Sequence, residues 1–295
     1  MEQDHPLGEG ITYDNYYNSS LSNLDAATCE AVAVGQAIGR QMAKPHIGYS
    51  TQIFTRLCGH AMSLMRAVPR TRWVIADFED WDFGCAAGHS RAIIEGFLLF
   101  LYIIEEPSCA QEWSSKLNVM HLNDCCRRIK LLTNSNAMED VEGLTEQAEE
   151  LRGRLRGNEW FLSLNASVQK RCLAGDNLMI ANRDEMLEKA AWDKKDFYAN
   201  WDLLSQYAHV LPISFYRMEP NGRGTGIEND TDKAYIALTM QLSAETLEKA
   251  TDLLVEAFPY TAAVRKGIQS KFSPGPRSNR PIAPAANKKK KIRKK

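Results

Sequence analysis

Apolar positions recur at helical spacing through most of the chain, and polar segments separate the apolar runs. The spacing predicts helices over residues 21–43, 50–68, 84–105, 108–132, 197–210 and 231–258. A proline follows four of these segments and cannot continue a helix: Pro45, Pro69, Pro107 and Pro259. The alternation typical of strands is weak, and its best instance covers 73–76.

This pattern predicts an all-α protein, an irregular multi-helix bundle with long antiparallel helices. We expect a polar N-terminal arm over 1–20 and a helical domain over 21–272. Residues 138–156 are charged with little apolar character, so we expect an exposed helical excursion there. The proline- and lysine-rich residues 273–295 predict a disordered basic tail.

Composition and charge narrow the classes of protein. The 295 residues are 44% hydrophobic and 25% charged, which excludes a fully disordered chain, a collagen-like fibre and a disulfide-dense miniprotein. Nine of the 36 Lys and Arg residues lie in 273–295, which holds no acid. Residues 1–272 therefore carry 27 basic against 37 acidic residues, which indicates an acidic body with a basic arm.

Cysteine usage and the polar first ten residues predict a cytoplasmic protein. Seven cysteines, two of them adjacent at Cys125 and Cys126, favour reduced thiols over a disulfide framework. The longest apolar run, 96–104, is too short to span a bilayer, and we interpret it as part of a buried helix.

Two polar pairs stand at helical spacing within apolar sequence. Arg91 and Glu95 are four residues apart and share one helix face, as do Ser205 and His209. A histidine can act as a general base near neutral pH, and an arginine can stabilise phosphate charge. The alternative for both pairs is structural: an internal ion pair and a histidine that hydrogen-bonds a carboxylate across the bundle.

These two segments resemble a bacterial all-helical family, the domain-of-unknown-function family 5677. The matching pieces are Arg91-x3-Glu95 with Tyr102, and Ser205-x-Tyr207-x-His209, within residues 85–215. The resemblance implies an all-helical fold and brings no established reaction.

A more distant analogy is with the ribonucleases of the higher eukaryotes and prokaryotes nucleotide-binding superfamily. These are helical bundles of toxin and antiphage systems, with an arginine four to six residues before a histidine. Arg40 and His46 have that spacing here, but Pro45 would break the helix between them. In this chain Arg91 and His209 would have to meet in space instead.

A metal site is the weaker interpretation of the remaining patterns. Cys85 with His89, and His121 with Cys125, each place a thiol and an imidazole on one helix face, as zinc sites can. The sequence has no Cys-x2-Cys pair and no paired Glu-x-x-His motif, so we expect neither metal nor cofactor. The acidic group within 77–82 is interpreted as a solvated turn, with a magnesium site as the alternative.

The basic tail predicts a partner with negative charge. Its charged residues are Lys288, Lys289, Lys290, Lys291, Arg293, Lys294 and Lys295. Such an arm can bind RNA or single-stranded DNA, an acidic protein or its own acidic body, or serve only solubility. A homo-oligomer is left open.

The sequence thus supports two hypotheses. The first is a nucleic-acid-associated bacterial protein, a defence or stress ribonuclease that needs no metal. His209 is then the acid and base, Arg91 stabilises phosphate, Glu95 orients one of them, and Ser205 and Tyr207 complete the site. The alternative is a non-enzymatic helical scaffold or adaptor, in which Arg91, Glu95 and His209 form a structural polar core.

Overall fold

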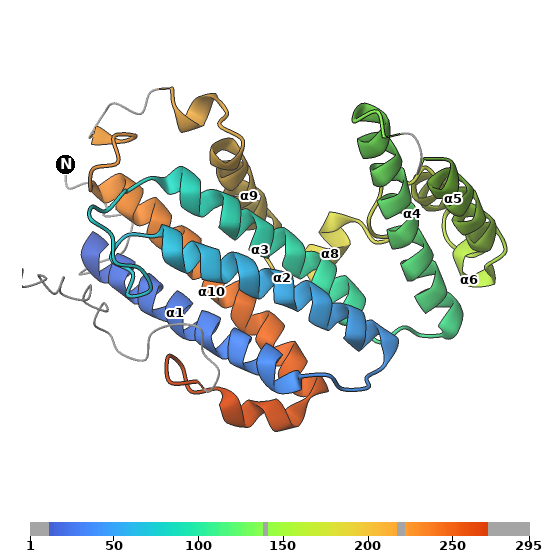
Figure 1. The fold of residues 1–295 in the computed structure, drawn as a ribbon, viewed down its shortest axis with the longest axis horizontal. Helices are drawn as coiled ribbons and strands as arrows, with labels where there is room; N and C mark the ends of the chain where they lie inside the picture. Colours follow the sequence, from blue (N-terminus) through green and yellow to red (C-terminus); the bar gives the residue numbers. More distant parts are fainter. Residues whose placement is uncertain (1–11, 138–140, 217–221, 271–295) are drawn as a thin grey trace, which may run out of the picture. The chain divides into compact units, whose positions relative to one another are not determined.

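The computed structural model describes residues 12–137, 141–216 and 222–270, and these are all-α (Figure 1). The long helices are α1 (Tyr13–Ile38), α2 (Pro45–Ala67), α3 (Phe83–Ile104), α4 (Ala110–Asn134), α5 (Val141–Arg156), α9 (Lys194–Ala208) and α10 (Asp230–Ala257). The short ones are α6 (Glu159–Leu162), α7 (Ala166–Leu173), α8 (Arg183–Lys189), and the 3-10 turns η2 (Pro212–Ser214) and η4 (Pro259–Val264). The predicted fold class is confirmed.

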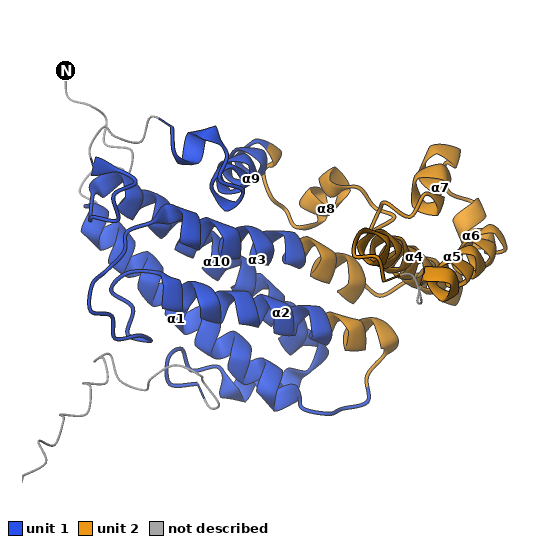
Figure 2. Cartoon of the chain, turned by 45° about the horizontal axis from the view of Figure 1, so that its top comes forward, with its two compact units in different colours: residues 1–42, 51–97, 195–295 blue, residues 43–50, 98–194 orange. Residues whose placement is uncertain are grey.

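The chain divides into two compact units (Figure 2). Unit 1 comprises 1–42, 51–97 and 195–295, and unit 2 comprises 43–50 and 98–194. In unit 1, α1 packs along α10, and the unit's parts of α2 and α3 lie beside them (Figure 1). Leu24 and Val34 of α1 and Met240 and Leu247 of α10 are fully buried and belong to this core.

Unit 2 is built on the pairing of α4 with α5, and α6 and α7 pack on the same pair. In α5, Ala148, Leu151 and Leu155 are buried and repeat at helical spacing. The helix expected as an exposed excursion thus has a buried face. Seven of its 16 residues are charged, and they conceal the three small or aliphatic positions that are enough for one apolar stripe. Residues 138–140 lie outside the described chain.

The first helix begins at Tyr13, inside the segment expected to be a polar arm. Thr12 caps it by accepting a hydrogen bond from the Asn15 backbone N–H. The Tyr17 ring is fully buried against Trp81, and its hydroxyl donates to the Pro69 carbonyl oxygen at 2.7 Å. A tyrosine that buries its ring and satisfies its hydroxyl serves as a core residue, which a polar composition conceals.

Helix α3 is long and apolar enough to cross a membrane by length and composition, and no other helix in the described ranges is. Half of its most apolar stretch, 50%, is buried in the fold. Ile93 and Phe97 are among its buried side chains. Gly96 lets α2 approach closely, since a Cβ there would lie 2.6 Å from Leu57 Cδ2.

Candidate functional site

Arg91 and Glu95 form the base of the candidate site, on one face of α3. Arg91 Nη2 donates to Glu95 Oε1 at 3.2 Å, as the four-residue spacing predicts. The Arg91 side chain is 19% exposed and the Glu95 side chain is 40% exposed. The pair therefore lies at the edge of the core, with the carboxylate closer to solvent.

His209 joins this pair from the C-terminal end of α9. Its Nε2 lies 2.6 Å from Arg91 Nη1. A guanidinium has donors and no acceptor, so Nε2 must accept this hydrogen bond. In this arrangement the imidazole is neutral and carries its proton on Nδ1. Arg91, Glu95 and His209 are thus brought together by the tertiary structure.

Trp201, one α9 residue to which the sequence assigned no role, completes the cluster. Its indole Nε1 donates to Glu95 Oε1 at 2.9 Å. The Arg91 guanidinium carbon lies 5.0 Å from the centre of the Trp201 ring, within cation–π range. The only signal in the sequence is that Trp201 precedes His209 by about two helical turns, which places both toward the same neighbour.

One polar atom of the cluster is left unsatisfied. Arg91 Nε is buried and has no hydrogen-bond partner among the described residues. His209, in contrast, is exposed. The guanidinium is therefore buried on its Nε side, and on its Nη1 side it contacts the exposed His209.

The residue that follows His209 has a strained backbone. The next residue, Val210, has a φ of 52°, which β-branched residues rarely adopt. This left-handed turn ends α9, and the Leu211 N–H donates to the Gln206 carbonyl oxygen at 2.8 Å. His209 is consequently the last residue before the chain turns away from the helix.

Ser205 and Tyr207, which were expected in the same site, are engaged elsewhere. The Ser205 hydroxyl donates to the Trp201 carbonyl oxygen at 2.6 Å, within its own helix. The Tyr207 hydroxyl accepts from Arg223 Nη2 at 2.7 Å, and its ring packs edge-on against Phe83 at 4.4 Å. The link from Ser205 to His209 is through the backbone, where the Ser205 carbonyl oxygen accepts from the His209 N–H at 3.1 Å.

The predicted metal pairs do not gather further ligands. In the described ranges no three or more His, Cys, Asp or Glu side chains are grouped to hold a metal ion. Cys85 donates to Asp82, whereas His89 faces His60 with 3.4 Å between their Nδ1 atoms. Burial lowers the pKa of both imidazoles, and for His60 the charges of His89 and Arg56 act in the same direction.

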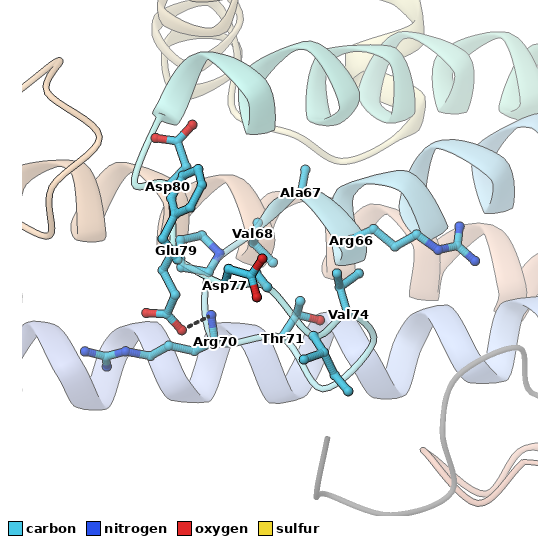
Figure 3. Close-up of a pocket in the computed structure, with 13 residues that line it drawn as sticks. Arg66, Ala67, Val68, Arg70, Thr71, Val74, Asp77, Glu79 and Asp80 are labelled. Carbon is cyan, nitrogen blue, oxygen red and sulfur yellow. Dashed lines mark hydrogen bonds between the residues drawn. The ribbon is translucent and has the colours of Figure 1, made fainter. Parts of the chain in front are cut away.

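A separate hollow of about 500 Å³ lies in the loop between α2 and α3 (Figure 3). Its lining includes Val74, Asp77 and Phe78, and the Arg70 backbone N–H donates to Glu79 beside it. No residue of the Arg91 cluster lines this hollow. Its mixed charges single out no ligand class.

The tail residues 288–295 lie outside the described chain, so their part in any site stays a prediction. The resemblance to a helical family of unknown function also stays a prediction. No family model, no curated protein and no solved structure matches this chain.

Proposed function

We propose that this protein is a nucleic-acid-associated cytoplasmic protein in which Arg91 and His209 bind and cleave RNA. One observation carries the proposal: an exposed imidazole accepts a 2.6 Å hydrogen bond from a partly buried guanidinium. An arginine held in this way is suited to a phosphate oxygen, because a guanidinium donates to phosphate with charge assistance. A role in defence or stress belongs to the same proposal.

An RNA phosphate would change the partner of Arg91. The anion accepts the Nη1 proton more strongly than a neutral imidazole does, since the acceptor is then charged. His209 Nε2 is thereby released, with its lone pair free and its ring still at the site. The base becomes available only when a phosphate is bound.

The reaction that fits this arrangement is transesterification. His209 Nε2 takes the proton of a ribose 2′-hydroxyl, and the 2′-oxygen attacks the adjacent phosphorus. The bond from phosphorus to the 5′-oxygen breaks, and that oxygen takes a proton from water. The resulting hydroxide recovers the proton held by His209. Arg91 stabilises the charge on the phosphoryl oxygens, and Glu95 with Trp201 positions Arg91.

Exposed aromatic residues follow His209 six and seven residues later in the chain, after the η2 turn. Phe215 is 60% exposed and Tyr216 is 64% exposed. Aromatic rings of this kind stack with the bases of single-stranded nucleic acid, which favours single-stranded over duplex RNA as the substrate. The basic tail would add contacts to phosphates without sequence preference.

The second candidate is a scaffold whose Arg91 cluster has a structural role only. It is favoured by the number of partners that already surround Arg91, namely Glu95, His209 and the Trp201 ring. The inward use of Ser205 and Tyr207 also favours it, because neither hydroxyl is left for a substrate.

The test is an RNA cleavage assay with the full chain, a labelled single-stranded RNA and matched variants. His209→Ala and Arg91→Gln should lower the rate by about 10²-fold or more, the usual loss for a general base or a charge-stabilising donor. Arg154→Gln is the control, because Arg154 also pairs with a glutamate four residues away, at 2.6 Å on α5. It should retain full activity.

The outcomes separate the two candidates. No cleavage by the full chain, or equal cleavage by His209→Ala, would overturn the ribonuclease. A lower melting temperature of His209→Ala without any change in RNA binding or cleavage would support the scaffold. Truncation after residue 272 should weaken RNA binding most at low salt and leave the cleavage chemistry intact.

A further inference from the structure

A polar groove lies between α1 and α10 of unit 1, apart from the Arg91 cluster. Its volume is about 220 Å³. Tyr16 and Asn23 line it from α1, and Gln241, Glu245 and Glu248 line it from α10. No lysine, arginine or histidine lines it, so the groove carries two negative charges and no positive one.

The positive charge that acts on a groove carboxylate is that of Arg265, which acts on Glu248 without forming an ion pair with it. Neither Glu245 nor Glu248 forms an ion pair within the part of the chain that the structure describes. The pKa of Glu248 is raised, first by burial and then by the negative charges of Asp252, Glu30 and Glu245, which outweigh the opposing positive charge of Arg265. The carboxylates of Glu30 and Asp252 thus belong to the same electrostatic environment.

The described residues after α10 already contact the carboxylates next to the groove. Arg265 Nε pairs with Glu30 at 2.8 Å, and its Nη1 pairs with Asp252. The Gly267 N–H donates to Glu30 Oε1 at 2.7 Å. Asp252 is one helical turn beyond Glu248 on α10, so Arg265 is anchored one turn from the groove, five residues before the described chain ends at residue 270.

The residues that follow have the charge and the length to occupy the groove. Residues 271–295 contain ten Lys or Arg and no acid. An extended chain covers roughly 3.3 Å per residue, whereas the α10 stretch from Asp252 back to Gln241 is only about 16 Å long. The first third of the segment can therefore reach the far end of the groove.

We propose that the basic C-terminal segment, residues 271–295, binds intramolecularly in the acidic groove between α1 and α10. Two observations carry this assignment: the opposite charges of the segment and the groove, and the ion pairs that Arg265 forms with Glu30 and Asp252 next to the groove. Each exposed ion pair contributes little, but tethering gives the segment a high effective concentration at the groove. The contact should weaken steeply with salt, because the charges are near the surface. The proposal is independent of the ribonuclease activity.

The experiment uses the full chain and a carbodiimide, which joins a lysine amine to a carboxylate in direct contact. At about 20 mM salt, tail lysines should cross-link to Glu245 and Glu248, and at about 1 M salt these cross-links should disappear. Equal cross-linking to the exposed Glu149 and Glu150 of α5 would overturn the proposal. A mixture of isotope-labelled and unlabelled chains identifies the partner, and cross-links between two copies would also overturn it.

Paired variants give a second readout. In Glu245→Gln/Glu248→Gln, trypsin should remove the tail at low salt at least about fivefold faster than in the unchanged protein. The control Glu149→Gln/Glu150→Gln removes the same charge from α5 and should leave the rate unchanged. Both pairs are conservative changes, and circular dichroism checks that α10 stays helical. An identical rate in all three proteins would contradict the proposal.

Discussion

Unit 1 contains two clusters that each combine an arginine, a carboxylate and a tryptophan. One is buried, and we call it closed; the other is partly exposed to solvent, and we call it open. In the closed cluster, Arg72 pairs with Asp25, and the Trp73 indole donates to Asp25 at 2.9 Å. In the open cluster, Arg91 pairs with Glu95, and the Trp201 indole donates to Glu95, also at 2.9 Å. Each carboxylate therefore accepts from one arginine and one tryptophan.

The two clusters differ in depth and in one further residue. The side chains of Arg72 and Asp25 are 7% and 9% exposed, so water cannot replace either partner. Glu95 is 40% exposed, and His209 adds a neutral imidazole that faces solvent. The same chemistry thus stabilises the fold where it is closed and offers a site where it is open.

Removal of the carboxylate from each cluster should give the largest difference in unfolding free energy between the two clusters. Asp25→Ala leaves Arg72 buried and unpaired, which we expect to cost about 3–5 kcal/mol of unfolding free energy. Glu95→Ala should cost less than about 1 kcal/mol, because solvent reaches that pair. Urea denaturation measures both. Equal losses would mean that the open cluster is structural in the same sense as the closed one.

Removal of the indole donors tests the same difference with smaller changes. Trp73→Phe takes one hydrogen bond from a buried carboxylate and should cost about 1.5–3 kcal/mol. In Trp201→Phe water can replace the lost donor, so the free energy of unfolding should fall by less. Both variants lose the same ring area, which makes each the control for the other. A larger loss of unfolding free energy in Trp201→Phe would show that the Arg91 cluster is the more deeply buried of the two.

Each cluster also adjoins a residue with positive φ, and glycine should affect the two in opposite directions. Val210→Gly relieves a β-branched residue at a φ of 52° and should raise stability by up to about 1 kcal/mol. Arg70→Gly also relieves a positive φ of 56°, but it removes ion pairs to Asp14 and Glu228 and should lower stability. Thermal unfolding reports both signs. Destabilisation by Val210→Gly would show that the valine side chain itself is needed.

The smallest effect concerns the pH dependence of stability that His60 and His89 confer. Burial lowers the pKa of His60 and His89 below the ordinary value of 6.5. Below about pH 6.5 the unfolded chain takes up protons that the folded chain resists, so stability is full above this pH and falls below it.

The melting temperature should therefore drop between about pH 7 and pH 5, and His60→Gln/His89→Gln should reduce the drop. The buried His46, whose pKa is also lowered by burial, should account for part of the drop that persists. An unchanged drop in the double variant would place the sensitivity outside the His60–His89 contact.

The helical architecture could be predicted because apolar spacing and proline positions act locally. The starts of α3 and α10 lie within one residue of the predicted 84 and 231. The start of α1 could not be predicted, since Tyr17 becomes a core residue only when Pro69 and Trp81 surround it. Nor could the buried face of α5, whose apolar stripe depends on α4.

For the site, the four-residue spacing led to a side-chain contact in one of the two pairs and not in the other. The four-residue interval correctly paired Arg91 with Glu95, because two opposite charges on one face attract. The same interval between Ser205 and His209 formed no pair, since a serine hydroxyl in a helix is satisfied by the carbonyl four residues earlier. Trp201 was missed because its partner lies 106 residues away in the chain.

The order of amino acids thus determined the helices, the acidic body, the basic C-terminal segment and the Arg91–Glu95 pair. These features follow from periodicity, from net charge and from interactions within one helical turn. The tertiary structure alone decided that His209 and Trp201 meet Arg91 and that Arg72 is closed off. Both depend on which helix faces pack together and how deeply, and the cost of burying a charge is set by that depth.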